Sequence, residues 1–130
     1  MDVFPLSAST FAICYFAPTT SYPTIIVGSV TSGVITYGAP TTITASAFSI
    51  GHCASAGSNA LIGIFWNSFA ATVNTFAATV SGTTVSVGTV TAQPVNAAGT
   101  AANNAVYGSC VFHVAQSKAY FCWTWLGAPN

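Results

Sequence analysis

Charged side chains are almost absent from this 130-residue sequence, and this constrains its fold more than any other feature. The chain has one Lys (Lys118), one Asp (Asp2) and no Arg or Glu, so 2% of its residues are charged, against about 25% in an ordinary soluble domain. Its Ala-rich stretches are broken by Thr, Gly and Asn and lack the charged residues of a helix surface. We therefore expect a single all-β domain spanning residues 1–130.

Short runs of Val, Ile, Thr and aromatic residues, which strands prefer, alternate with turn signals along the chain. Ser32-Gly33 and Ser81-Gly82 stand between such runs and predict hairpin turns, because Gly readily adopts a positive φ. Strands are expected at 11–17, 24–30, 34–37, 48–53, 60–66, 75–80, 84–90, 105–114 and 119–125.

The runs also repeat. The segment 30–38 (VTSGVITYG) is echoed by 80–88 (VSGTTVSVG), and the first strand near 11 is echoed near 60 and again near 119. This predicts two four-stranded repeats, at about 11–59 and 60–118, followed by an extra strand at 119–125. Four short strands in a unit of 40–50 residues are typical of propeller blades. The alternative is a single β-sandwich or jelly roll.

The string ATVSGTTVSVG at 78–88, followed by an aromatic strand, resembles the tandem β-repeats of bacteriophage fibres and virion surface proteins. The resemblance covers most of residues 11–125. It implies a virion structural role, such as a capsid decoration or fibre protein, with other virion proteins as partners. The known repeats often carry Asp and Lys in their loops, whereas this chain does not.

Composition also bears on partners and location. The formal net charge is zero, so no basic patch is available for nucleic acid or an anionic membrane surface. No apolar run reaches membrane-spanning length, and the N-terminus does not read as a signal peptide. We expect synthesis in a host cytoplasm and a final location on the virion. Cys14, Cys53, Cys110 and Cys122 are expected to be reduced and buried.

Few residues suit catalysis or metal binding, so we expect neither an enzyme nor a bound metal or cofactor. His52, Cys53, Cys110 and His113 have zinc-ligand chemistry, but adjacent His52 and Cys53 would point to opposite faces of a strand. A Cys53–His113 nucleophile pair would lack a carboxylate to orient it. A glycosidase needs two carboxylates, and no P-loop or dinucleotide-binding glycine pattern is present.

Aromatic residues are the stronger candidates for a functional role. Trp66 and Trp125, 59 residues apart, are expected at equivalent repeat positions, where they could stack on a sugar or pack in an interface. In the strand at 119–125, alternation puts Phe121, Trp123 and Trp125 on one aromatic face, expected to be buried or interfacial.

Two incomplete repeats and an almost chargeless surface predict a homo-oligomer, a trimer by preference. The leading expectation is therefore a non-enzymatic virion structural protein. The alternative is a small oligomeric lectin or adhesin that binds a glycan.

Overall fold

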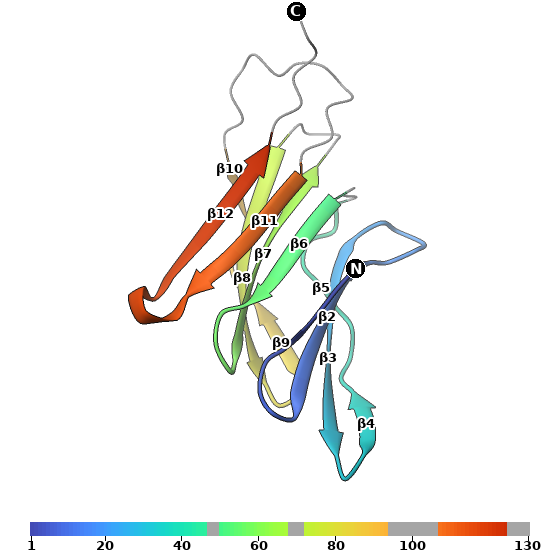
Figure 1. Cartoon of the computed structure of the whole chain (residues 1–130). Helices are drawn as coiled ribbons and strands as arrows, with labels where there is room; N and C mark the ends of the chain where they lie inside the picture. The colour runs from blue at the N-terminus through green and yellow to red at the C-terminus, as the bar shows by residue number, and fades with distance from the viewer. Residues whose placement is uncertain (47–49, 68–71, 94–106, 125–130) are drawn as a thin grey trace, which may run out of the picture.

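The protein is a stack of three antiparallel β-layers. A computed structural model of the chain describes residues 1–46, 50–67, 72–93 and 107–124. Figure 1 shows the three layers side by side, in the order in which they occur along the chain. The all-β class expected from the sequence is confirmed, since the one helical element in the described residues is a single 3₁₀ turn.

The first sheet contains β1 (Asp2–Pro5), β2 (Thr10–Phe16), β3 (Pro23–Thr31), β4 (Val34–Tyr37) and β5 (Thr41–Thr42). Its central path runs β1-β2-β3-β4, and β5 pairs with β3 beyond the end of β4.

The second sheet contains β6 (Ile50–Ser55), β7 (Ala60–Asn67), β8 (Thr72–Ser81), β9 (Thr84–Val87) and β10 (Thr91–Gln93). It has the same topology, with β6, β7 and β8 in order and both β9 and β10 on the far side of β8.

The third layer is a hairpin of β11 (Tyr107–His113) and β12 (Lys118–Thr124), joined by the 3₁₀ turn Val114–Gln116. Ser117 closes this turn in the left-handed conformation, with φ of 51°. We call this layer the C-terminal hairpin.

The first two sheets are copies of one another in register, 50 residues apart. Both partners of a pair shift by this number in every ladder: Asp2–Cys14 becomes His52–Ile64, Thr10–Ser29 becomes Ala60–Thr79, Gly28–Tyr37 becomes Ala78–Val87, and Thr24–Thr42 becomes Asn74–Ala92. The turns follow the same rule, since Val30 N–H donates to Ser9 O and Val80 N–H to Asn59 O. Because pairing and turns both shift by 50, the internal repeat is a property of the backbone.

The repeat boundaries differ from those expected. The strand expected near 48–53 at the end of the first repeat is β6, which pairs with β7 and therefore opens the second sheet. Three strands were missed: β1, which contains Asp2 and Pro5, and the very short β5 and β10. Each sheet consequently has five strands rather than four.

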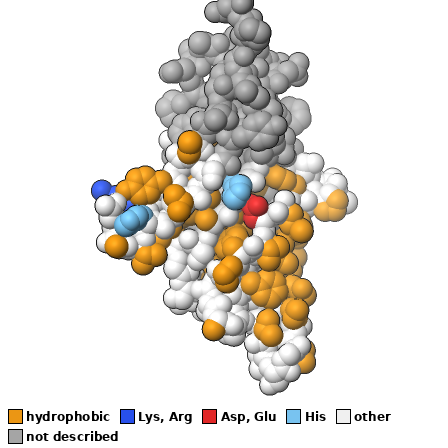
Figure 2. All heavy atoms as spheres, in the orientation of Figure 1, with side chains coloured by type: hydrophobic (Ala, Val, Ile, Leu, Met, Phe, Trp, Pro, Cys, Tyr) orange, Lys and Arg blue, Asp and Glu red, His pale blue; other side chains and the backbone are white. Residues whose placement is uncertain are grey.

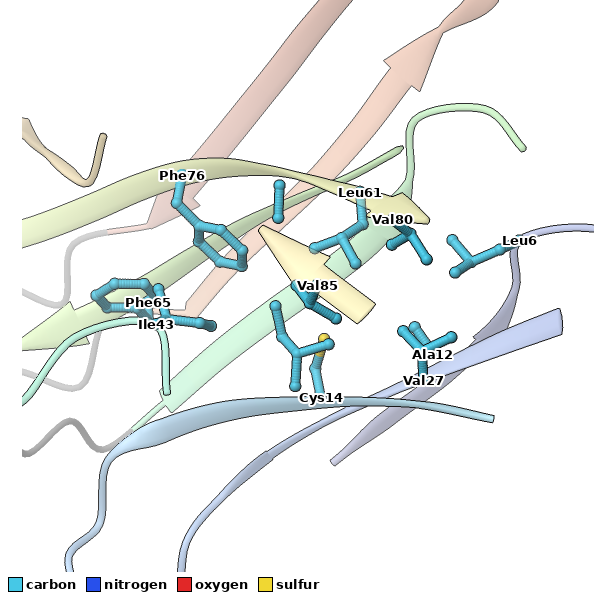
Figure 3. Packing of buried hydrophobic residues seen from close by; sticks show 12 residues of the cluster. Leu6, Ala12, Cys14, Val27, Ile43, Leu61, Phe65, Phe76, Val80 and Val85 are labelled. Atoms are coloured by element: carbon cyan, nitrogen blue, oxygen red, sulfur yellow. The ribbon is translucent and has the colours of Figure 1, made fainter. Parts of the chain in front are cut away.

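Two hydrophobic clusters hold the layers together. The first lies between the two sheets and combines Ala12, Cys14, Ile25 and Val27 from one side with Leu61, Phe65, Phe76 and Val80 from the other. Figure 3 shows these two sets of side chains pointing toward each other. The second cluster lies between the second sheet and the C-terminal hairpin, and contains Ile62, Ile64, Trp66, Val73 and Cys110.

Candidate interaction surface

Each layer has two faces, which the clusters distinguish. We define the forward face of a layer as the one toward the next layer in sequence, and the rear face as its opposite. In β7, Ile62 and Ile64 belong to the forward face and contact the C-terminal hairpin, whereas Leu61 and Phe65 belong to the rear face and contact the first sheet. This alternation is the period of two expected of a strand.

The rear face of the second sheet is apolar and buried. Its main side chains are those of Leu61, Phe65, Phe76, Ala78, Val80 and Val85, none of which is more than 8% exposed. They pack on the forward face of the first sheet, so burial of this face joins the two sheets.

The rear face of the first sheet carries apolar residues at the same positions but is open. Subtracting 50 from the positions just named gives Phe11, Tyr15, Ile26, Gly28, Val30 and Ile35. Val30 is 39% exposed and Ile35 51%, whereas their equivalents Val80 and Val85 are 7% and 8% exposed. Val3 and Tyr37 extend this face and are 58% and 55% exposed.

The aromatic residues of this open face form an organised surface. The ring of Phe11 lies over Gly28, where a Cβ atom would overlap it. Phe11 also meets Tyr37 edge to face, with centroids 6.0 Å apart and an interplanar angle of 88°. Beside them, Ile13, Tyr15 and Ile26 line a shallow hollow. Figure 2 shows hydrophobic side chains gathered on the side of the molecule occupied by the first sheet, and very few charged ones.

A second exposed apolar surface lies on the forward face of the C-terminal hairpin. Val111 pairs with Tyr120 there, and the two are 59% and 48% exposed. The hydroxyl of Tyr120 donates to Oε1 of Gln116 at 2.7 Å, which fixes one end of the side chain and leaves its ring exposed. Cys122 is also exposed, so the expectation that all four cysteines are buried is wrong at this position.

The one carboxylate side chain of the sequence joins the edges of the two sheets. Oδ2 of Asp2 accepts a hydrogen bond from the backbone N–H of Cys53 at 2.9 Å and lies 3.7 Å from Nδ1 of His52. Asp2 and His52 occupy equivalent positions in their sheets. The carboxylate therefore satisfies an outward-facing N–H on the edge strand β6.

The thiols near this contact are held in the protonated form. The pKa of Cys53 is raised far above its ordinary range, first by a hydrogen bond with Cys14 and then by burial. Burial raises the pKa of Cys110 to about 12. Thiolates are the nucleophilic form of cysteine, so these environments oppose the Cys53 nucleophile considered from the sequence.

The four residues with zinc-ligand chemistry, His52, Cys53, Cys110 and His113, do not form one cluster. His113 lies at the tip of the C-terminal hairpin, where its Nδ1 accepts from the backbone N–H of Gln116 at 3.2 Å. Cys110 instead donates to the carbonyl of His52 at 3.5 Å. Among the described residues, no group of three or more His, Cys, Asp or Glu side chains could hold a metal ion.

The aromatic candidates of the sequence lie at the junction of the second sheet and the C-terminal hairpin. Trp66 is 7% exposed and belongs to the cluster on the forward face of the second sheet. Phe121 packs against the same cluster from the rear face of the hairpin and is half-buried. Trp123 lies in β12 and pairs with Gly108, whereas Trp125 lies outside the described residues.

The offset of 59 residues does not preserve the faces of β7 and β12. An offset of 59 would match the forward-face residue Ile62 with Phe121, which lies on the rear face of the hairpin. Only an even offset between β7 and β12 keeps the faces matched, because side chains alternate along a strand.

Comparisons with known proteins identify no relative. No protein family, curated protein or solved structure matches this chain. In the part of the chain that the structure describes, no helix is long and apolar enough to cross a membrane.

Proposed function

We propose that this chain is a non-enzymatic structural subunit that self-associates through the rear face of its first sheet. The observation that carries this proposal is the correspondence between two surfaces. The open rear face of the first sheet has apolar residues at the positions whose equivalents, 50 residues later, form a buried interface in the second sheet.

Physical chemistry supports this role. A contiguous exposed apolar surface on a protein marks a site of interaction. Charged side chains would normally oppose nonspecific association, and the chain has only two residues of this kind. Tyr15 and Tyr37 suit such a surface, because their rings contribute apolar contact area while their hydroxyls tolerate water.

Within this proposal, the virion role rests on the resemblance of the repeat around 78–88 to phage fibre and surface-protein repeats. A capsid decoration or fibre protein has to form many identical contacts, and a stackable β-layer supplies such contacts without a catalytic site.

Light scattering of the purified protein at micromolar concentration tests the association. We expect an oligomer for the natural sequence and a monomer for the double variant Ile35→Glu/Tyr37→Glu, because buried unpaired carboxylates strongly oppose an apolar interface. Val34→Glu is the matched control, since Val34 is 62% exposed and alternates with Ile35 on β4. It should leave the oligomer intact. A stable monomer for the natural sequence would refute the proposed function.

A further inference from the structure

We infer that the partner of the open rear face is the forward face of the C-terminal hairpin of a second copy, so that copies associate head to tail. This inference rests on the proposed function and adds the identity of the partner surface.

The order of the layers inside one chain has a direction. The forward face of the first sheet packs on the rear face of the second sheet, and the forward face of the second sheet packs on the rear face of the hairpin. Both internal junctions therefore join a forward face to a rear face. Among the described residues, no layer covers the rear face of the first sheet or the forward face of the hairpin.

The hairpin corresponds to the opening strands of a third repeat. Cys110 and Phe121 are paired and face the second sheet, as the paired Cys53 and Gly63 of the second sheet face the first. With these two pairs matched, the segment that joins the paired residues is one residue longer in the hairpin than in the second sheet. It also makes Val111–Tyr120 the equivalent of Ala54–Ile62 and Phe4–Ala12.

These three equivalent pairs have different surroundings. Phe4 and Ala12 pack in the cluster between the sheets, and Ala54 and Ile62 pack against the hairpin. In the first two layers this pair contacts the rear face of the layer that follows. In the hairpin the equivalent pair, Val111 and Tyr120, is exposed, and the rear face of another copy would supply the contact.

The two open surfaces are chemically matched. The side chains at their centres are apolar or aromatic. Lys118 alternates onto the same face as Tyr120, but it lies exposed at the turn end of the hairpin, where its ammonium group can stay in water at the rim of the contact. Contact between two different patches is heterologous, and copies joined in this way form a ring if the rotation closes and an open fibre if it does not. A trimer, the oligomer favoured from the sequence, is one such ring.

Mixing two variants, each with one disabled surface, tests the head-to-tail contact. Ile35→Glu/Tyr37→Glu disables the rear face, and Val111→Glu/Tyr120→Glu disables the forward face. We expect each variant alone to be monomeric by light scattering. An equimolar mixture should form a 1:1 dimer and nothing larger, because only one intact surface of each kind remains.

The other outcomes are distinguishable. If the natural protein associates and the hairpin variant associates equally well, the rear face pairs with itself or with another surface, and the head-to-tail inference is overturned while the proposed function stands. Two monomeric variants that fail to form a dimer also overturn the inference. Urea unfolding of each variant verifies that it folds, and the milder changes Tyr37→Ser and Val111→Ser/Tyr120→Ser replace any that does not.

Discussion

The two sheets share one backbone plan, but their rear faces have different surroundings. In the second sheet this face is covered by the first sheet and carries Phe65 and Val87, whereas the first sheet has Tyr15 and Tyr37 at those positions. A fully buried phenol needs a hydrogen-bond partner within the protein, whereas at an open surface or the wet edge of an interface water can be that partner. The position of a layer in the stack therefore determines which apolar side chains its rear face can carry.

Truncating equivalent rear-face residues should destabilise the two sheets by clearly different amounts. Phe76 is 3% exposed in the core, and Phe76→Ala should lower the free energy of unfolding by about 3–5 kcal/mol through loss of burial and an unfilled cavity. Its equivalent Ile26 is half-buried, so Ile26→Ala should cost only about 1 kcal/mol. Urea unfolding in the Ile35→Glu/Tyr37→Glu background measures both changes. Equal losses would contradict the assignment of one face as covered and the other as open.

Much of the backbone could be predicted from the sequence, because strand and turn chemistry act locally. The turn expected at Ser32-Gly33 is present, with φ of 51° and 79° at these two residues, the arrangement that a two-residue hairpin loop favours. In the second sheet the loop residues are Gly82 and Thr83, one position later than expected, and Gly82 supplies the positive φ. The repeat distance of 50 was visible in the same segments.

The rest depended on contacts between distant residues. β1 contains Pro5 and Asp2, which strands disfavour, and it forms because β2 offers it a pairing edge. Because the repeats expected from the sequence begin at the second strand, β2, and not at β1, both expected repeats start one strand late. The exposure of Cys122 could not be predicted from its apolar neighbours, because it depends on whether a further layer covers the hairpin. The open surface does have a sequence signal, because the 50-residue offset relates its apolar residues to the buried ones of the second sheet.

Gly38 and Gly88 occupy equivalent positions with different surroundings. A Cβ at Gly38 would overlap the backbone of Thr83 in the second sheet, whereas a Cβ at Gly88 would lie 3.1 Å from the carbonyl of Ala77 in its own sheet. Gly38→Ala should therefore cost about 1–3 kcal/mol by forcing the sheets apart, and Gly88→Ala distinctly less. Urea unfolding of the two variants measures the difference. If Gly88→Ala were the more harmful change, the close approach of the sheets at Gly38 would not matter to stability.

The two faces of the C-terminal hairpin should differ in thiol chemistry. Cys110 lies on the covered rear face, where burial raises its pKa from 9.0 to about 12, and Cys122 lies on the open forward face. Between these values the folded state keeps a proton that the unfolded state releases, so raising the pH through this window removes stability. Deprotonation of Cys110 in the unfolded state should make the free energy of unfolding about 1.4 kcal/mol lower at pH 10 than at pH 7.

Urea unfolding at both pH values isolates this contribution when the natural protein is compared with Cys110→Ala, because the other titrating groups cancel in the difference. The pH-dependent loss should be smaller in the variant by about the same amount.

Thiol labelling of the natural protein at pH 8 should modify Cys122 in the dissociated state and leave Cys110 unmodified, since a buried, protonated thiol reacts slowly. Under associating conditions, protection of Cys122 is expected from the head-to-tail contact. Rapid labelling of Cys110, or an unchanged pH dependence in Cys110→Ala, would show that the second sheet does not cover the hairpin's rear face in solution.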